Sequence, residues 1–346
     1  MGIRHIFAAA ARCTRLDRLR PEARLAGLAL AFAAAGAAAQ PALQLPLRSN
    51  PGQDCWIANH VDLDPGRGAR DYACGVLTYD AHDGTDLALR DLQAMREGVA
   101  VLAAARGTVR AVREGMADAN VRETGGDKVR ERECGNGLRI DHGEGWETQY
   151  CHLKRGSLRV RRGERVEPGQ ALGLVGLSGA TEYPHLHFTL RRHRDVVDPF
   201  RGSDAPSCGV GGNPLWDAAT LARLPYSPGA IYNYGVAASL PRPVDVREGR
   251  HRGRVLERDA GALVVWLEVF GVAAGDTVRL SVRGPGSLLL FQEKMILKKR
   301  QARVYRAAGR KRGAEPWPAG AYEAEITLQR AVEPAAPAVR LSFEVR

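Results

Sequence analysis

Two short histidine patterns, far apart in the chain, constrain this sequence most. His185 and His187 are separated by one residue in Tyr-Pro-His-Leu-His-Phe, and His82 precedes Asp86 by four positions. Side chains two positions apart on a β-strand point to the same face, so the first pattern predicts neighbouring imidazoles on a strand. Hydrolytic zinc sites use three nitrogen or oxygen ligands and keep a fourth position open. The patterns therefore predict one metal site on a β-sheet.

The residues nominated as metal ligands are His82, Asp86 and His187. His185, on the same strand face, would then lie beside the metal, where an imidazole can exchange a proton or stabilise a transition state. His152, in Tyr-Cys-His-Leu, is the natural second partner. The alternative is a purely structural zinc site, but such sites usually have four protein ligands, often cysteines.

Further motifs accompany these histidines between residues 75 and 200. In chain order the motifs are His82-x-x-x-Asp86, Gly135-Asn136-Gly137-Leu138-x-Ile140-x-His142, Tyr150-x-His152-Leu153, Gly176-x-Ser178-Gly179 and His185-x-His187. Short spacings of this kind arise by chance, but an ordered set is a specific signal. The set resembles the lysostaphin-like (LytM-type) zinc endopeptidases, which cut peptide cross-links in bacterial cell walls.

The resemblance implies an exported zinc metalloendopeptidase that hydrolyses peptide cross-links of peptidoglycan with a zinc-activated water. One zinc ion per chain would be held by His82, Asp86 and His187, and His152 and His185 would be the catalytic pair. Which of these two is the general base stays open. The bond also stays open between glycine-containing bridges and the D-alanine to diaminopimelate cross-link, which a periplasmic enzyme would meet. Elastin-like proteins are a further substrate class suggested by the resemblance.

A binding module is the alternative class, because some proteins of this fold activate other wall hydrolases without cutting. Those proteins typically lack several of the site positions, and none is lost here. His60, His193 and His251 have no ligand-like spacing, so we expect them to be packed or solvated.

Three polar residues near the motifs have simpler interpretations. His142 stands where the family often has a histidine that is structural or supports the ligands. Asp83 is expected to be a turn residue beside Gly84. Asn136, between two glycines, is either a substrate contact or a turn residue that tolerates positive φ.

The start of the chain predicts export. Residues 25–39 are an apolar run that follows an arginine-rich segment and ends in small residues, so residues 1–39 are predicted to be a signal peptide cut near Ala39. The long basic segment leaves two alternatives open: a true start downstream of Met1, or a segment that stays as an anchor. The expected location is periplasmic or secreted.

Five cysteines follow the predicted signal peptide, and an odd number leaves one thiol that is either free or paired with another molecule. Exported proteins keep disulfides. We expect Cys134 to pair with Cys151, at either end of a predicted hairpin, and Cys55 to pair with Cys74. Cys208 would then be free.

Of the formal net charge of +11, the segment before residue 40 contributes +4, from six arginines and two acids, and the remaining +7 is spread along the rest of the chain. In an exported protein this excess favours contact with anionic wall polymers or a membrane surface, and no nucleic-acid recognition motif occurs. The sequence leaves the oligomeric state open.

The fold class expected is all-β: an antiparallel LytM-type catalytic domain followed by an immunoglobulin-like β-sandwich. The predicted boundaries are an N-terminal lead-in at 40–74, the peptidase domain at 75–205, a linker at 206–243 and the sandwich at 244–346. The sandwich is expected to be a spacer or docking domain. Within the peptidase domain, residues 115–133 are predicted to be an exposed loop that selects substrate, and residues 87–96 a short helix or loop.

Overall fold

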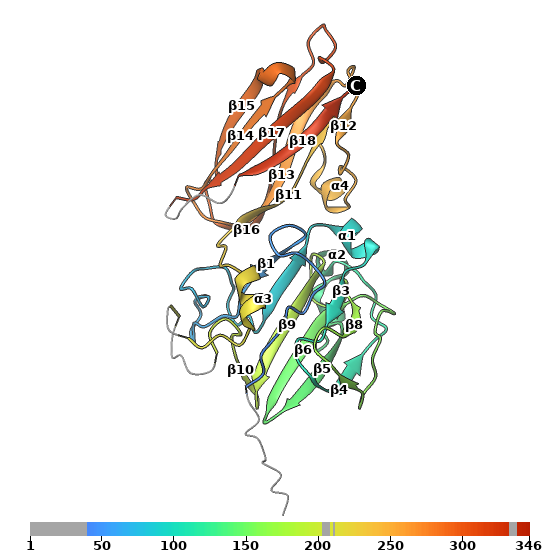
Figure 1. The fold of residues 1–346 in the computed structure, drawn as a ribbon, viewed down its shortest axis with the longest axis vertical. Coiled ribbons are helices and arrows are strands. Elements are labelled where there is room, and N and C mark those ends of the chain that lie inside the picture. The colour runs from blue at the N-terminus through green and yellow to red at the C-terminus, as the bar shows by residue number, and fades with distance from the viewer. Residues whose placement is uncertain (1–39, 203–207, 210–211, 332–337) are drawn as a thin grey trace, which may run out of the picture. The chain divides into compact units, whose positions relative to one another are not determined.

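The computed structural model describes residues 40–202, 208–209, 212–331 and 338–346. Strands form most of the ordered structure, and the helices are few and short (Figure 1). The prediction of an all-β chain is therefore confirmed. The predicted signal peptide lies outside the described residues. None of the helices in those ranges has the length and apolar character of a membrane span.

The first half of the structure is built on an eight-stranded antiparallel sheet, here called the main sheet. Its order is β1, β2, β9, β6, β5, β4 and β7, with β10 beside β9. The strands are β1 Cys55–Asn59, β2 Thr85–Leu89, β4 Gly107–Arg113, β5 Asn136–Gly143, β6 Trp146–Leu153, β7 Arg165–Val166, β9 His185–Arg192 and β10 Asp195–Val196. A separate pair is formed by β3 Ala100–Leu102 and β8 Ala171–Leu174.

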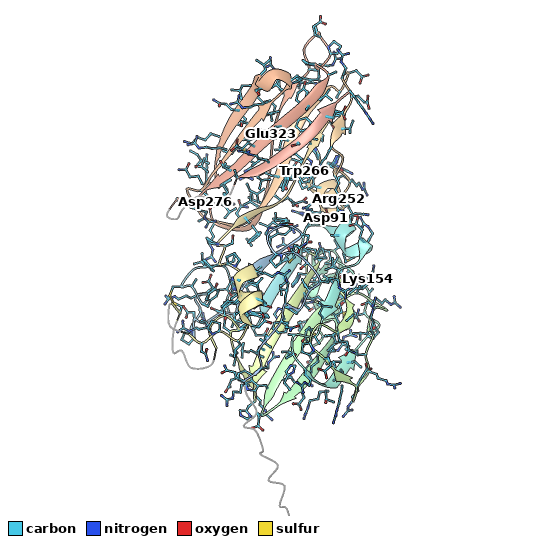
Figure 2. All side chains as sticks on the ribbon, in the orientation of Figure 1. Asp91, Lys154, Arg252, Trp266, Asp276 and Glu323 are labelled. Carbon is cyan, nitrogen blue, oxygen red and sulfur yellow. A yellow bond between two sulfur atoms is a disulfide. The ribbon has the colours of Figure 1, made fainter. Side chains whose placement is uncertain are left out.

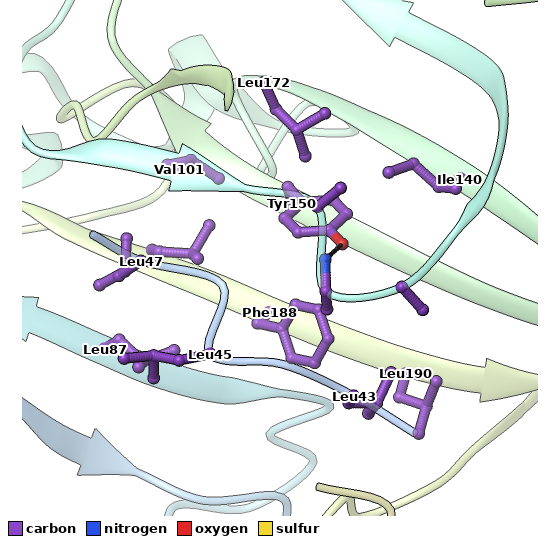
Figure 3. Packing of buried hydrophobic residues seen from close by; sticks show 14 of the residues in the cluster. Leu43, Leu45, Leu47, Leu87, Val101, Ile140, Tyr150, Leu172, Phe188 and Leu190 are labelled. Atoms are coloured by element: carbon purple, nitrogen blue, oxygen red, sulfur yellow. Dashed lines mark hydrogen bonds between the residues drawn. The ribbon is translucent and has the colours of Figure 1, made fainter. Parts of the chain in front are cut away.

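One face of the main sheet packs on a hydrophobic core, because apolar side chains alternate with polar ones along its strands. Leu186, Phe188 and Leu190 of β9 are fully buried there. Tyr150 of β6 lies among them, and its hydroxyl accepts a hydrogen bond of 2.9 Å from the main-chain N–H of Ala104 (Figure 3). The opposite face is left free for polar side chains.

The predicted lead-in at 40–74 packs on the main sheet. Leu43 and Leu47 are buried in the core of this sheet, and β1 extends it by pairing with β2. The segment is therefore part of the sheet and of its core.

The segment predicted as one short helix or loop contains two elements. β2 continues to Leu89, and helix α1 spans Leu92–Glu97. Asp91 caps α1 by accepting a hydrogen bond from the N–H of Ala94, which is the usual role of an aspartate before the first helical turn. The same carboxylate pairs with Arg252 (Figure 2).

Two further sheets make up the C-terminal part. A three-stranded sheet runs β11, β13, β16, and a five-stranded sheet runs β12, β18, β17, β14, β15. The strands are β11 Ala230–Ala237, β12 Val255–Leu256, β13 Ala262–Val272, β14 Thr277–Arg283, β15 Leu289–Ile296, β16 Gln301–Lys311, β17 Gly320–Gln329 and β18 Val339–Val345. Apolar side chains of both sheets share one core, which is a two-sheet arrangement.

The remaining helices are short. They are α2 Val121–Thr124, α3 Ala218–Arg223 and α4 Pro243–Arg247, with 3₁₀ turns at Gly126–Val129 and Pro285–Ser287. Both α3 and β11 lie in the stretch 206–243 predicted as linker, and β11 pairs with β13 along its length. The domain limits and the immunoglobulin-like class remain predictions.

Of the two predicted disulfides, one is present and the other is not. The Cys134–Cys151 bridge is confirmed, but Cys74 pairs with Cys208 and Cys55 is free. The predicted Cys55–Cys74 bridge is wrong because Cys55 lies inside strand β1, where its thiol meets the Ser49 hydroxyl. Cys208 is brought to Cys74 by a hydrogen bond from the N–H of Gly209 to the carbonyl of Tyr72.

This pairing gives a direct prediction for cysteine mapping. Proteolysis without reduction should release the two linked peptide pairs, Cys74 with Cys208 and Cys134 with Cys151. Cys55 should resist alkylation in the native chain and react after unfolding, because burial raises the pKa of its thiol to about 12. A linked peptide containing Cys55 and Cys74 would contradict the structure.

Candidate metal centre

The register between β2 and β9 brings the nominated ligands together. Asp86 of β2 pairs directly with His187 of β9, and paired residues in an antiparallel sheet share one face. His185, two residues before His187, lies on the same face. His82 precedes β2, and its ring lies 5.0 Å from that of His187, centroid to centroid. The structure thus unites all three residues on the free face of the main sheet.

The atoms that face each other are close enough to hold one metal ion. His82 Nε2 lies 3.2 Å from His187 Nδ1, and Asp86 Oδ1 lies 2.9 Å from the same Nδ1. Asp86 Oδ2 is 3.2 Å from His82 Nε2. Tetrahedral zinc with ligands at its usual bond lengths holds them about 3.3 Å apart. The three side chains are therefore already near the separations that zinc requires.

The hydrogen bonds behind the rings decide which nitrogens are free. His82 Nδ1 lies 2.6 Å from the carbonyl oxygen of His60, which can only accept, so Nδ1 carries the proton and Nε2 a lone pair. His187 Nε2 lies 3.0 Å from a carboxylate oxygen of Asp83 and donates to it. Two imidazole nitrogens and a carboxylate thus converge on one point, an arrangement that a cation stabilises.

The ionisation of the cluster in the absence of metal follows from the same contacts. Burial lowers the pKa of His187, but hydrogen bonds and charges of Asp83 and Asp86 outweigh it and raise that pKa to about 9. Burial also raises the pKa of Asp86, yet the charges of His82 and His185 hold it well below its usual value. A proton thus occupies the place that a metal ion would take.

His152 and His185 form a second pair beside this cluster. Their ring centroids lie 4.6 Å apart. His152 Nδ1 donates to the carbonyl of Ser178 at 2.7 Å, and His185 Nδ1 donates to that of Tyr183 at 3.0 Å. Each ring therefore presents Nε2 to the site, and His185 Nε2 lies 3.4 Å from Asp86. His152, His185 and His187 also lie close enough to form an alternative group of metal ligands.

The environment of His152 favours its neutral form. Burial is the largest cause, and the neighbouring rings of His185 and His187 add to it, so the pKa of His152 lies well below 6.5. Its backbone has a φ of 62°, in the left-handed region where non-glycine residues are uncommon. Such conformations cluster at functional sites, because they are kept only where the surroundings hold them.

Several supporting residues were not identified from the sequence. Asp83, expected to be only a turn residue, holds His187 and also pairs with Arg191 at 2.6 Å. Asn59 donates to the Asp86 carboxylate at 2.8 Å. His60 supplies its main-chain carbonyl to the site. None of these contacts has a spacing signal, because each depends on how distant strands pair.

Two other residues also have resolved roles. Asn136 is fully buried, and its side chain bonds both main-chain groups of Met116 and the carbonyl of Leu153. Neither interpretation of Asn136 is therefore correct, because it fastens residue 116 to β6 while the positive φ belongs to Gly135. His142 contacts the Arg106 carbonyl and Thr148, which agrees with a structural role.

Comparison with known proteins finds similarity in the central part of the chain. Residues 80–199 match the sequence family described as Peptidase family M23. The cell division protein DipM of Caulobacter vibrioides is 36% identical over 70 residues, which cover 20% of this chain and 11% of DipM. The peptidoglycan DD-endopeptidase ShyA of Vibrio cholerae is 41% identical over 57 residues, 16% of this chain and 13% of ShyA. The chain thus spans less than a fifth of the length of these relatives.

Solved structures are also similar to this chain. The catalytic domain of the prophage-encoded M23 protein EnpA from Enterococcus faecalis is 22% identical, and the match covers 46% of this chain and 93% of that domain, with a TM-score of 0.30.

Zinc binding should depend on pH in a defined direction. The metal must displace the His187 proton, which is held with a pKa of about 9, so affinity should fall about tenfold for each pH unit below that value. Titration calorimetry near neutral pH, in buffers of different ionisation enthalpy, should report the release of about one proton per zinc. An affinity that does not change between pH 6 and pH 8 would contradict this arrangement.

The Asp83 contact gives a second prediction. Asp83→Ala should weaken zinc binding by about 10-fold to 100-fold, because it removes the hydrogen bond that orients His187. Asp141→Ala is the matched control, since Asp141 is also on the main sheet and paired with an arginine, Arg110. Competition with a chromophoric chelator measures both affinities. Equal affinities for the two variants would refute a supporting role for Asp83.

Proposed function

We propose that the peptidase family M23 domain formed by residues 80–199 acts as an exported zinc metalloendopeptidase that hydrolyses peptide cross-links in bacterial peptidoglycan. The observation that carries this proposal is the convergence of two imidazole nitrogens and one buried carboxylate on a single face of the sheet. A closed structural site would leave no histidines spare, whereas this one has two.

In this proposal His82, Asp86 and His187 hold one zinc ion. Bound zinc supplies Lewis-acid polarisation of the scissile carbonyl and makes a water molecule more acidic. His60 and Asp83 fix the two imidazole ligands in the orientation that directs their lone pairs to the metal.

His152 and His185 move protons in the proposed reaction. His152 is kept neutral by burial, so its Nε2 is able to accept a proton from the attacking water near neutral pH. His185 stands beside it, with its Nδ1–H anchored to the Tyr183 carbonyl, and its Nε2, once it has taken up a proton, can donate a hydrogen bond to the negative charge on the former carbonyl oxygen. Main-chain carbonyls orient both rings, which reduces the reorganisation needed during the reaction.

The substrate is inferred from the relatives. ShyA is named as a peptidoglycan DD-endopeptidase, so the bond proposed here is the D-alanine to diaminopimelate cross-link. Two disulfides fit an oxidising compartment outside the cytoplasm, where this polymer lies. The alternative of a non-enzymatic activator is disfavoured because the sequence keeps all five residues proposed for the site.

The test uses isolated peptidoglycan and the chain lacking residues 1–39. Cross-linked muropeptide dimers should be converted to monomers by the wild-type protein carrying one zinc ion. His152→Ala and His185→Ala should each keep zinc but lose at least about 100-fold in turnover, because general acid–base groups contribute that much.

His142→Ala is the matched control, since His142 lies on the same sheet and is bonded elsewhere. It should keep both zinc and activity. If either catalytic variant retains full turnover, the assigned pair is wrong. If the zinc-loaded wild type releases no product from any wall, the enzyme proposal fails.

A further inference from the structure

A row of paired residues runs across the main sheet from the metal centre to the side chain of Arg113. His187 of β9 pairs with Cys151 of β6, and Gly137 of β5 pairs with Arg113 of β4. The bridge from Cys151 to Cys134 joins the two pairs, because Cys134 Sγ lies 3.0 Å from where a Cβ on Gly137 would stand. Paired residues share a face, so all of these side chains lie on the face that carries the metal ligands.

The length of this row matches a short peptide. Three strand spacings of about 4.8 Å separate β9 from β4, or about 14 Å, and an extended peptide advances about 3.3 Å per residue. The row therefore spans about four residues of substrate. A pocket of about 160 Å³ lies over it, lined by Arg113, Cys134, Gly137 and Gln149 among others.

Gly137 leaves the middle of the row without a projecting side chain. A Cβ there would stand 2.3 Å from the carbonyl oxygen of Tyr150, so a larger residue would not fit without moving backbone. Cys151 is tied down by its disulfide. An extended chain therefore finds no long side chain rising from Gly137 or Cys151 along this path.

A second, larger pocket begins where the row ends. It measures about 530 Å³ and shares Arg113 with the first. Its apolar lining includes Met116 and Val129, and its cations include Lys128 and Arg132. The pocket is defined by these residues and is here called the loop pocket, because residues 115–132 supply most of its wall.

The loop pocket is held against the catalytic residues by buried contacts. The Asn136 side chain ties Met116 to the end of β6, directly after His152. Gly179 lines the pocket, and the preceding residue, Ser178, provides the carbonyl that orients His152. The pocket is thus part of the same rigid frame as the proposed active site.

Two cations of the loop pocket have charges available for a ligand. Among the described residues, the Arg113 guanidinium and the Lys128 ammonium form no ion pair or hydrogen bond. The charge of Arg113 helps to lower the pKa of Glu133, but the two side chains do not form an ion pair. Glu114 also lines the pocket, but its carboxylate accepts the main-chain N–H groups of Gly156 and Leu158. The pocket therefore presents unneutralised positive charge beside an apolar wall.

We infer that the loop pocket is a subsite for an acidic peptide, in which Arg113 and Lys128 bind a carboxylate about 14 Å along the row from the metal centre. The inference rests on the proposed function and adds the substrate class. Stem peptides of peptidoglycan carry carboxylates on glutamate and diaminopimelate, and the hydrocarbon chain of diaminopimelate suits the apolar wall. Charge-assisted hydrogen bonds from arginine make such recognition specific.

The test is binding of a soluble stem tetrapeptide that ends in D-alanine, measured by calorimetry on the zinc-loaded chain. Two forms are compared, with the glutamate and diaminopimelate carboxylates either free or amidated. The wild type should bind the free form about tenfold more tightly, as expected for a charge-assisted contact. The Arg113→Gln, Lys128→Gln double variant should bind both forms equally, with the weaker affinity.

The matched control is Arg130→Gln, which removes the same charge from the same loop. Arg130 is exposed, pairs with Asp127 and does not line the pocket, so this variant should keep the wild-type preference. Equal wild-type affinities for the two forms, or a preference that survives the double substitution, would overturn the subsite.

Failure of the subsite is separable from failure of the proposed function. If the wild type cleaves walls but binds the free and amidated peptides equally, only the subsite proposal is refuted. If the wild type prefers the peptide with free carboxylates but cleaves no wall, the subsite proposal is supported and the enzyme proposal is refuted.

Discussion

The pairing of β2 with β9 is the contact on which the site depends. It sets Asp86 opposite His187, and the period of two along β9 adds His185 to the same face. A slip of one residue in this register would turn the imidazoles into the core and the apolar residues outward. The burial of Leu186 and Phe188 therefore fixes the position of the polar residues between and beside them. The alternation of apolar and polar residues along β9 therefore specifies both the hydrophobic core and the proposed site.

Electrostatics at this face then favours a cation. The hydrogen bonds that hold the rings come from groups behind the site: the carbonyls of His60, Ser178 and Tyr183, and the carboxylate of Asp83. Each leaves the opposite nitrogen directed inward. Lone pairs and a buried carboxylate would repel one another without a proton or a metal between them. The pKa of His187 is raised for the same reason, because without a metal a proton offsets this repulsion.

The sequence predicted the all-β class, the Cys134–Cys151 bridge and the residues that meet at the site, because a period of two and ordered motifs are local signals. It did not reveal the pairing of Cys74 with Cys208 or the contact of Asp83 with His187. Both depend on how distant segments meet, which no spacing records. Strand β11 was missed for another reason: its segment is surrounded by glycine and proline, which resemble a linker.

Anomalous diffraction at the zinc edge, on crystals of the zinc-loaded chain, tests the central claim most directly. The histidines form two overlapping groups that share His187, and either group could hold an ion. The account predicts one zinc peak within about 2.0–2.2 Å of His82 Nε2, an Asp86 oxygen and His187 Nδ1. A peak bonded instead to His152, His185 and His187 would contradict it, because no histidine pair would then remain free for proton transfer.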